Sequence, residues 1–273
     1  MAVEPRWVPV DVDTSKANIA RVYDYWLGGS HNFRADQDVA RAMIAVDPNI
    51  TAMMRANRAF LGRAIRYLAR EAGIRQFLDI GSGIPTEQNV HEVAQAAAPG
   101  SRIVYVDNDE VAVAHSRLIL ETDPDVAIIR ADLREPAGIL ADPATQLLLD
   151  FTQPVAVLLV AVMHFIPDEA RPAQIMATLR AALVPGSYLV ICHACRDARP
   201  DTADNATAVY TSRVPAHLRV RTRDEIAALL DGFTLVEPGL VWIPQWRPDS
   251  PADVPENPEQ FWALVGVARL GPG

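Results

Sequence analysis

The 273-residue sequence has little cysteine, no basic excess and no long apolar run, and each absence excludes a class of protein. No apolar stretch reaches the roughly 20 residues that a membrane-spanning helix needs. The first residues lack a basic segment followed by an apolar one, so no secretory signal is predicted and the protein is expected in the cytoplasm. The net charge of −9 argues against a nucleic-acid surface, which normally carries a basic patch.

Only two cysteines are present, and they stand close together as Cys192 and Cys195. A C-x-x-C pair can be a redox centre or half of a zinc site, but a four-thiolate site needs two further cysteines. A redox pair also favours a helix N-terminus, where the pKa of a thiol falls. Here the pair follows the apolar segment 187–191, so the sequence predicts cysteines at the end of a strand and no metal site.

The N-terminal quarter of the chain shows helical patterning. Apolar residues recur at helical spacing in segments 14–27, 35–46 and 49–73, and Asp13 or Thr14 is expected to cap the first helix. We therefore interpret residues 1–73 as an N-terminal helical lid.

From residue 74 onward, short apolar runs alternate with helical segments. This alternation predicts an α/β fold with a mostly parallel sheet that is covered by helices on both faces. The last two runs have no helix between them, which indicates a closing antiparallel hairpin. The expected strands cover residues 76–81, 102–109, 127–133, 154–162, 186–194, 233–243 and 260–270. The prediction is a Rossmann-like, seven-stranded core spanning residues 74–273, with an antiparallel last strand.

Glycine and polar residues follow the first three predicted strands. The first strand leads into Gly81-Ser82-Gly83, the second ends at Asp107 beside Asn108, and the third ends at Asp132. A glycine turn between a strand and a helix lets a ligand approach the backbone, and a carboxylate after the second strand can hold ribose hydroxyls. Because the carboxyl ends of parallel strands meet at one edge, these groups predict an adenosine-binding site.

The acidity of this turn bears on which adenosine ligand it binds. A dinucleotide fingerprint has a third glycine where this sequence has Thr86, and a diphosphate prefers an uncluttered helix N-terminus. Asp79 lies directly before the turn and suits a cationic ligand better than a phosphate. S-adenosylmethionine carries an ammonium and a sulfonium, so the residues favour it over NAD. An NAD-dependent oxidoreductase is an alternative that uses the same turn.

Several segments together resemble a known enzyme family. The motifs DIGSGIPT at 79–86 and VYVDND at 104–109, with the order of strands and helices, are similar to class I S-adenosylmethionine-dependent methyltransferases. More narrowly, nearly the whole chain resembles an actinobacterial family of such methyltransferases whose substrate is undefined. The further matching segments are ARVYDYWLGGSHNFRAD, RANRAFLGRAIRYL, HFIPDE and EPGLVWIPQWRP. One departure is Cys192-His193-Ala194-Cys195, where the family pattern is closer to Ser-His-Ala-Thr.

This resemblance implies a set of cofactor contacts. Asp79 would reach toward the methionine ammonium, Asp107 would hold the ribose, and Asn108 would lie beside the adenine. The other cofactor-lining residues that it implies are Gly81, Ser82, Gly83, Asp132, Leu133, Ala161 and Met163. The implied activity is transfer of a methyl group from S-adenosylmethionine to an unidentified, small-molecule acceptor.

Two histidines follow later strands and are the candidate catalytic residues. His164 comes after the fourth strand, and His193 lies at the end of the fifth. Histidine is the side chain most easily tuned to accept a proton near neutral pH. Methyl transfer depends mainly on alignment, and a base helps when the acceptor is a hydroxyl or a protonated amine. Packing or capping roles are the alternative for both, and a noncatalytic S-adenosylmethionine sensor is an alternative for the whole protein.

An early polar and aromatic segment is expected to complete the site. The stretch YDYWLGGSHNFRAD, residues 23–36, is predicted to fold over the cofactor. We expect Tyr23 and Asn32 to contact the cofactor, while Trp26 and Phe33 pack the helices together.

A second segment near the expected acceptor pocket is harder to assign. Residues 196–219 lack clear helical periodicity and lie between the fifth strand and the next helix. Long loops of this kind are often functional, so the segment is either a substrate lid that presents Tyr210 and Arg213 or a variable surface loop.

Overall fold

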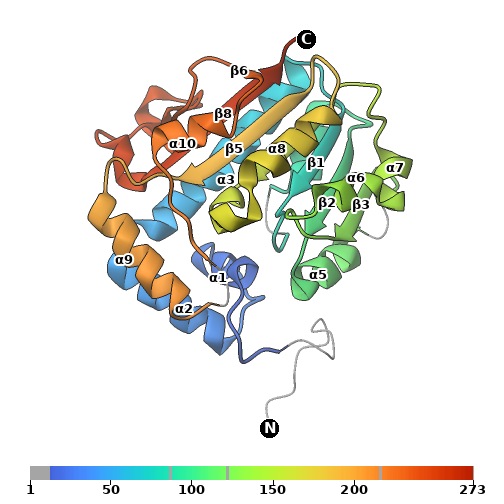
Figure 1. Cartoon of the computed structure of the whole chain (residues 1–273). Coiled ribbons are helices and arrows are strands. Elements are labelled where there is room, and N and C mark those ends of the chain that lie inside the picture. The colour runs from blue at the N-terminus through green and yellow to red at the C-terminus, as the bar shows by residue number, and fades with distance from the viewer. Residues whose placement is uncertain (1–12, 86–87, 121–122, 215–216, 273) are drawn as a thin grey trace.

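The fold is built around one eight-stranded sheet in the order β3-β2-β1-β4-β5-β8-β6, with β7 paired to β8. In the computed structural model (Figure 1), the described residues are 13–85, 88–120, 123–214 and 217–272. The strands are β1 (Gln76–Ile80), β2 (Arg102–Asp107), β3 (Val126–Arg130), β4 (Ala156–Val160), β5 (Tyr188–Ala194), β6 (Phe233–Leu235), β7 (Val241–Trp242) and β8 (Ala263–Leu270). Strands β1 to β5 pair in parallel, and β8 is antiparallel to β5. The α/β class and the antiparallel last strand are confirmed.

Helices accompany the sheet along the whole described chain. The α-helices are α1 (Ile19–Trp26), α2 (Arg34–Val46), α3 (Ile50–Arg70), α4 (Val90–Ala97), α5 (Glu110–Leu120), α6 (Pro136–Ala141), α7 (Pro143–Leu148), α8 (Pro172–Ala181), α9 (Pro200–Thr211) and α10 (Arg223–Ala228). Short 3-10 turns are η1 (Met163–Phe165), η2 (Asp168–Ala170), η3 (Ile243–Gln245), η4 (Pro251–Asp253) and η5 (Pro258–Phe261). No helix in the described ranges is long and apolar enough to cross a membrane.

The sheet has eight strands rather than the seven predicted, because the expected strand 233–243 is interrupted. Pro238 has no backbone N–H to donate to a ladder, and the N–H of Gly239 instead donates to the carbonyl of Val236 at 2.8 Å. This turn divides the segment into β6 and β7, which both pair with β8.

Alternate residues of the strands enter two different apolar clusters. Phe77 of β1 belongs to one cluster, which includes Leu68 of α3. Its neighbour Leu78 belongs to the other, which includes Ile175 of α8 and Ile139 of α6. The period of two is that of an extended strand, so the sheet is buried on both faces between helical layers (Figure 1).

The three N-terminal helices lie in two different parts of the fold. The long helix α3 packs into the core on one face of the sheet, whereas α1 and α2 lie beyond the ends of the strands, beside α9 (Figure 1). Only α1 and α2 are therefore placed as a lid would be. The domain boundary at residue 73 stays a prediction about the sequence, since α3 shares its core with the strands.

The first helix begins later than expected. Its cap is Asn18, whose side-chain oxygen accepts a hydrogen bond from the N–H of Ala20 at 2.8 Å, and not Asp13 or Thr14. The buried carboxylate of Asp36 on α2 accepts hydrogen bonds from the backbone N–H of Asn18 and pairs with Arg21 of α1 at 3.2 Å. A group far along the chain thus selects where α1 starts, which local patterning cannot reveal.

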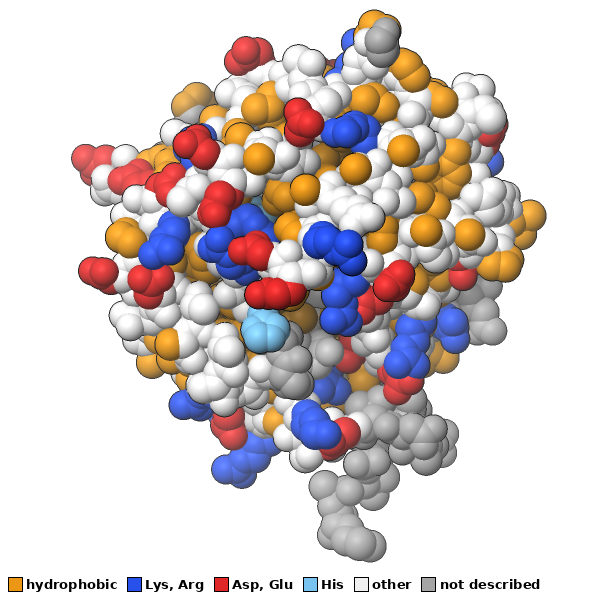
Figure 2. Space-filling view, viewed as in Figure 1, with side chains coloured by type: hydrophobic (Ala, Val, Ile, Leu, Met, Phe, Trp, Pro, Cys, Tyr) orange, Lys and Arg blue, Asp and Glu red, His pale blue; other side chains and the backbone are white. Residues whose placement is uncertain are grey.

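The outer surface shows charges of both signs. On the face seen in Figure 2, basic and acidic side chains are interspersed with apolar atoms. Ion pairs with exposed partners in the described chain include Arg66 with Asp249 and Arg196 with Asp204.

Candidate functional site

A cleft of about 340 Å³ lies at the carboxyl ends of β1, β2, β3 and β4. Helix α1 and the middle of α3 form its other side, so the cleft is enclosed between the sheet and the N-terminal helices. Ten of the residues predicted to bind a cofactor line it: Tyr23, Asp79, Gly81, Ser82, Gly83, Asp107, Asn108, Asp132, Leu133 and Ala161. Thr86, which the sequence reasoning used against a dinucleotide, lies outside the described residues.

The turn after β1 has a shape that only glycine fits well. Gly81 has φ of +79°, and a Cβ there would come within 2.5 Å of Val162. Gly83 has φ of +67°, and its N–H donates to the carboxylate of Asp107 at 2.7 Å. The hydroxyl of Ser82 is buried and has no hydrogen-bond partner among the described residues. A bound ligand is the natural partner for such a group.

Two buried carboxyl groups give this cleft its electrostatic character. Burial raises the pKa of Asp79 to about 7, and the nearby charge of Asp107 raises it further while Arg58 opposes the rise. Burial also raises the pKa of Asp107 to about 6, although hydrogen bonds from the N–H groups of Asp109 and Gly83 oppose it. Both carboxylates would be stabilised by a cation, because the charged form is what burial penalises.

The third carboxylate is already engaged by its neighbours. Asp132 forms an ion pair with Arg134, whose Nε donates at 2.9 Å. The pKa of Asp132 is lowered by this partner most of all and also by a hydrogen bond with Asn108. Asp132 lies where the sequence placed it, but an adenine amine would have to share its oxygens with the guanidinium group.

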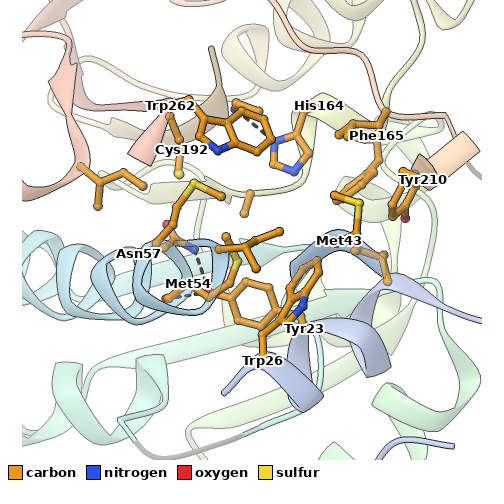
Figure 3. Close-up of a pocket in the computed structure, with 18 residues that line it drawn as sticks. Tyr23, Trp26, Met43, Met54, Asn57, His164, Phe165, Cys192, Tyr210 and Trp262 are labelled. Atoms are coloured by element: carbon orange, nitrogen blue, oxygen red, sulfur yellow. Dashed lines mark hydrogen bonds between the residues drawn. The ribbon is translucent and has the colours of Figure 1, made fainter. Parts of the chain in front are cut away.

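A second, smaller cavity of about 80 Å³ adjoins the cleft, and we call it the chamber. Figure 3 shows its wall of aromatic and methionine side chains, which come from α1, α2, α3, η1, α9 and the residue before β8, Trp262. Its described lining residues include no Asp, Glu, Lys or Arg. Five residues line both cavities: Ile19, Tyr23, Asn57, Ala161 and Phe165.

Tyr23 and Asn57 form a bonded pair where the cavities meet. The Asn57 amide donates to the Tyr23 hydroxyl at 2.9 Å, and that hydroxyl donates to the carbonyl of Met54 at 3.3 Å. Burial raises the pKa of Tyr23 to about 12, so its hydroxyl keeps its proton at neutral pH. The other end of the amide, Oδ1 of Asn57, is buried and has no partner in the described chain.

The two candidate histidines occupy different surroundings. His164 lines the chamber, and its Nδ1 accepts a long hydrogen bond of 3.4 Å from the N–H of Ala194. Figure 3 shows its other ring nitrogen turned toward the chamber. His193 is fully buried and lines neither cavity, with Nδ1 at 2.8 Å from the carbonyl of Ala194 and Nε2 at 2.9 Å from Arg221.

Burial makes both imidazoles weak bases. It holds the pKa of His164 well below its usual range, helped by His193 and Arg221, and it lowers the pKa of His193 to about 3. Because both nitrogens of His193 are engaged away from the cavities, its geometry gives no support to the prediction that it is catalytic. Its neighbour Cys192 does line the chamber, with a thiol pKa raised to about 12 by burial.

Ala161 and Met163, both predicted to lie near the methyl group, are separated by the structure. Ala161 has φ of +62°, an uncommon conformation for a residue with a Cβ, and it forms part of both cavity walls. Met163 is fully buried in the other apolar cluster and lines neither cavity. The turn at Ala161 directs the chain away from β4, so the side chain two residues later faces the core.

Asn32 was predicted to contact the cofactor but is used within its own loop. Its amide donates to Asp24 at 2.8 Å and to the carbonyl of Gly29 at 3.0 Å, while Gln37 donates to its oxygen. It is absent from the described lining of both cavities. Trp26, expected only to pack helices, lines the chamber instead.

The segment 196–219 contains a helix that its pattern did not reveal. Helix α9 spans Pro200–Thr211 and brings Tyr210 to the chamber wall. The Tyr210 hydroxyl is buried and unpartnered within the described residues. Arg213, the other predicted acceptor contact, lines neither of these cavities.

The part of the cavity walls that α3 forms was not predicted from the sequence. Asn57 and Arg58 line the cleft from its middle, and Met53 and Met54 reach the chamber. A signal was present, because Asn57 is a polar residue at a buried position of an amphipathic helix and therefore needs a partner.

The cleft fits S-adenosylmethionine on three observations. The glycine turn after β1 leaves room for a ligand at the backbone. The hydroxyl of Ser82 in this turn has no hydrogen-bond partner among the described residues. No described residue donates a hydrogen bond to Asp79, so its carboxylate can face an ammonium. These features suit a cationic amino-acid group better than a phosphate.

Comparisons with known proteins agree with this geometry. A family model described as S-adenosyl methyltransferase matches residues 5–271. The chain is similar to a proposed methyltransferase from Thermobifida fusca, with 38% identity over 98% of this chain and 100% of that one and a TM-score of 0.92. It is also similar to a DUF574 family protein from Streptomyces avermitilis, with 40% identity over 95% and 99% of the two chains and a TM-score of 0.90. An O-methyltransferase family protein from Burkholderia thailandensis shares the fold at 12% identity over 88% and 62% of the chains, with a TM-score of 0.54. No curated protein matches the chain.

Proposed function

This chain belongs to the S-adenosyl methyltransferase family, and we propose that it transfers the methyl group of S-adenosylmethionine to a small-molecule acceptor held in the chamber. The observation that carries this proposal is the shared wall between cleft and chamber. A donor in one cavity and an acceptor in the other would meet beside Ala161, where both cavities are lined by the same residue.

The residues of the cleft have distinct proposed tasks. Asp79 pairs with the ammonium group, Asp107 holds the ribose, and the Ser82 hydroxyl binds a polar atom of the methionine portion. Asn108, Leu133 and the Asp132–Arg134 pair border the adenine. Asp79, Asp107 and the Ser82 hydroxyl are buried, which strengthens the hydrogen bonds that they make, whereas Asn108 and Arg134 are exposed.

The chemistry requires little from the protein beyond alignment. When bound, the cofactor supplies a methyl carbon on a positively charged sulfur. In the transfer, the acceptor's lone pair would form the new bond to that carbon, the electron pair of the carbon–sulfur bond would stay on sulfur, and the acceptor's proton would pass to water. We assign the proton to water because the lowered pKa of His164 makes its imidazole a weak base. The ring proton of His164 lies on Nε2, because Nδ1 already accepts a hydrogen bond from Ala194. Nε2 faces the chamber and can donate this proton in a hydrogen bond to the acceptor molecule (Figure 3).

A pair of serine variants tests the cofactor site. Ser82→Ala removes a hydroxyl without a partner in the described chain, so it should weaken S-adenosylmethionine binding by ~1 kcal/mol and leave stability unchanged. Ser187→Ala is the matched control, because that buried hydroxyl accepts from the N–H of Val155 at 3.2 Å, far from the cleft. It should lower stability and spare the affinity. Titration calorimetry and thermal unfolding give both readings, and no binding at high micromolar cofactor would refute the proposal.

Turnover separates an enzyme from a noncatalytic binder of the same cofactor. Protein incubated with radiolabelled S-adenosylmethionine and a small-molecule extract should transfer label to at least one component. Binding without transfer to any component would favour the sensor alternative.

A further inference from the structure

The chamber restricts the chemical class of the acceptor, an inference that rests on the proposed function. We propose that the acceptor is a neutral, compact molecule with an apolar ring and one hydroxyl or amino group, whose hydrogen is bound by Asn57. The ring would occupy the chamber, and the reacting atom would lie where chamber and cleft meet.

The polarity of the wall selects a neutral molecule. The titratable groups that line the chamber within the described residues are uncharged at neutral pH, because burial raises the pKa values of Tyr23, Cys192 and Tyr210 and lowers the pKa of His164. A carboxylate or an ammonium would therefore lose its hydration and gain no opposite charge. Such a group is expected to bind at least ~100-fold more weakly than a neutral one, because an unpaired buried charge is costly.

The shape of the wall favours a ring. Trp26, Phe165, Tyr210 and Trp262 present aromatic surface from four different parts of the chain (Figure 3). The cavity of about 80 Å³ is smaller than the ~150 Å³ engineered cavity that holds benzene. A ring therefore enters only when side chains of the wall move aside, and Met53 is among the methionines flexible enough to do so.

Two orphaned polar atoms show where the ring's polar group belongs. Oδ1 of Asn57 and the hydroxyl of Tyr210 are buried in the chamber wall and have no partner among the described residues. The orientation of Asn57 is fixed, since its amide nitrogen donates to Tyr23 at 2.9 Å. Oδ1 is therefore an acceptor that needs a donor, and Asn57 lines both cavities. A hydroxyl or amino group at this junction satisfies it and stands beside the cleft.

A series of matched ligands tests the class directly. The full-length protein, saturated with S-adenosylhomocysteine, is titrated with 4-ethylphenol, 4-hydroxyphenylacetate, tyramine and 4-ethylanisole, and isothermal titration calorimetry reports binding. We expect the neutral phenol to bind at least ~100-fold more tightly than its anionic and cationic analogues. It should bind ~10-fold more tightly than the anisole, which has no hydrogen to donate to Asn57. Failure of the phenol to bind, or equal binding of a charged analogue, would overturn the proposal.

Variants then locate the binding. Asn57→Ala should abolish the preference for phenol over anisole while the ring still binds. Met53→Ala enlarges the chamber, so the affinity for 2-naphthol should rise ~10-fold relative to 4-ethylphenol. Met176→Ala on α8 is the matched control, because Met176 has similar burial in the other apolar cluster. If Met176→Ala changes ligand preference as Met53→Ala does, the ligands bind outside the chamber and the inference is wrong.

The two proposals fail in different ways. If S-adenosylhomocysteine does not bind, the methyltransferase proposal fails whatever the phenols do. If it binds and labelled methyl groups pass only to charged acceptors, the methyltransferase proposal stands and the neutral acceptor class is refuted.

Discussion

Asp79→Asn should remove most of the pH dependence of cofactor affinity between pH 6 and pH 7. In the cofactor-free protein the pKa of Asp79 is raised to about 7, so this carboxyl is mostly protonated at pH 6. An ammonium beside it would lower that pKa, and binding would then release a proton. Affinity should therefore rise with pH by up to about tenfold per unit and level off above pH 7.

The size of the effect follows from the two raised pKa values. From pH 5 to pH 7 the wild-type affinity should improve by up to ~50-fold through Asp79 alone, or ~2.3 kcal/mol. Asp107, with its pKa raised to about 6, contributes mainly to the lower half of that range. In Asp79→Asn the rise of cofactor affinity with pH should nearly disappear above pH 6. The rise that remains below pH 6 is assigned to Asp107.

Calorimetric titration with S-adenosylhomocysteine at half-unit steps from pH 5 to pH 7 provides the measurement. This product lacks the sulfonium but keeps the ammonium, so it isolates the pairing assigned to Asp79. An equal slope in the wild type and in Asp79→Asn would refute the assignment.

Unfolding of the cofactor-free protein gives an independent check on the same carboxyl. A folded-state pKa raised from 3.8 to about 7 means that the folded protein binds more protons than the unfolded chain within that range. Its stabilising contribution is present at low pH and lost as the pH rises, by at most ~4 kcal/mol. Asp79→Asn should accordingly gain stability relative to the wild type as the pH rises from 5 to 7.5.

Four further changes probe the lid, the core and the ribose site. Gly29→Ala should cost ~1–3 kcal/mol in denaturant unfolding, because its Cβ would overlap the carboxylate of Asp24, while Gly138→Ala, in open space, should be neutral. Arg221→Met should lower the free energy of unfolding by ~1–3 kcal/mol, since it leaves the carbonyls of Met163 and Ile166 without their guanidinium donor, while Asp168 keeps its bond with Arg219. Asp107→Ala should weaken cofactor binding by more than ~1 kcal/mol in calorimetry, and an unchanged affinity would remove it from the site. Deleting residues 1–36 takes away α1 and should reduce both cofactor affinity and turnover in a protein that still folds; full activity would contradict the lid.

The strand-end residues could be predicted from sequence because backbone topology alone places them. Asp79, Asp107 and Asp132 lie at or just beyond the carboxyl ends of parallel strands that the structure sets side by side, and they line one cleft. That inference needs only the period of the apolar pattern and the rule that parallel strands share an edge. The directions of side chains beyond the strand ends could not be predicted in this way. Met163 lies only two residues from Ala161, yet a left-handed turn sends it into the core.

The chamber could not be predicted, because its wall is assembled from distant segments. Trp26 lies on α1, Asn57 on α3 and Tyr210 on α9, and Trp262 lies between η5 and β8, so no local pattern shows that these residues meet. Helix α9 escaped detection for a related reason. It buries Ala203, Ala206 and Tyr210 against its surroundings, and two alanines leave a faint apolar stripe.

The shared wall of the two cavities also links the affinities of the two proposed ligands. Ile19, Tyr23, Asn57, Ala161 and Phe165 border both spaces, so a donor in the cleft and an acceptor in the chamber would contact the same side chains. Each ligand would then change the affinity for the other, and by thermodynamic necessity both affinities change by the same factor.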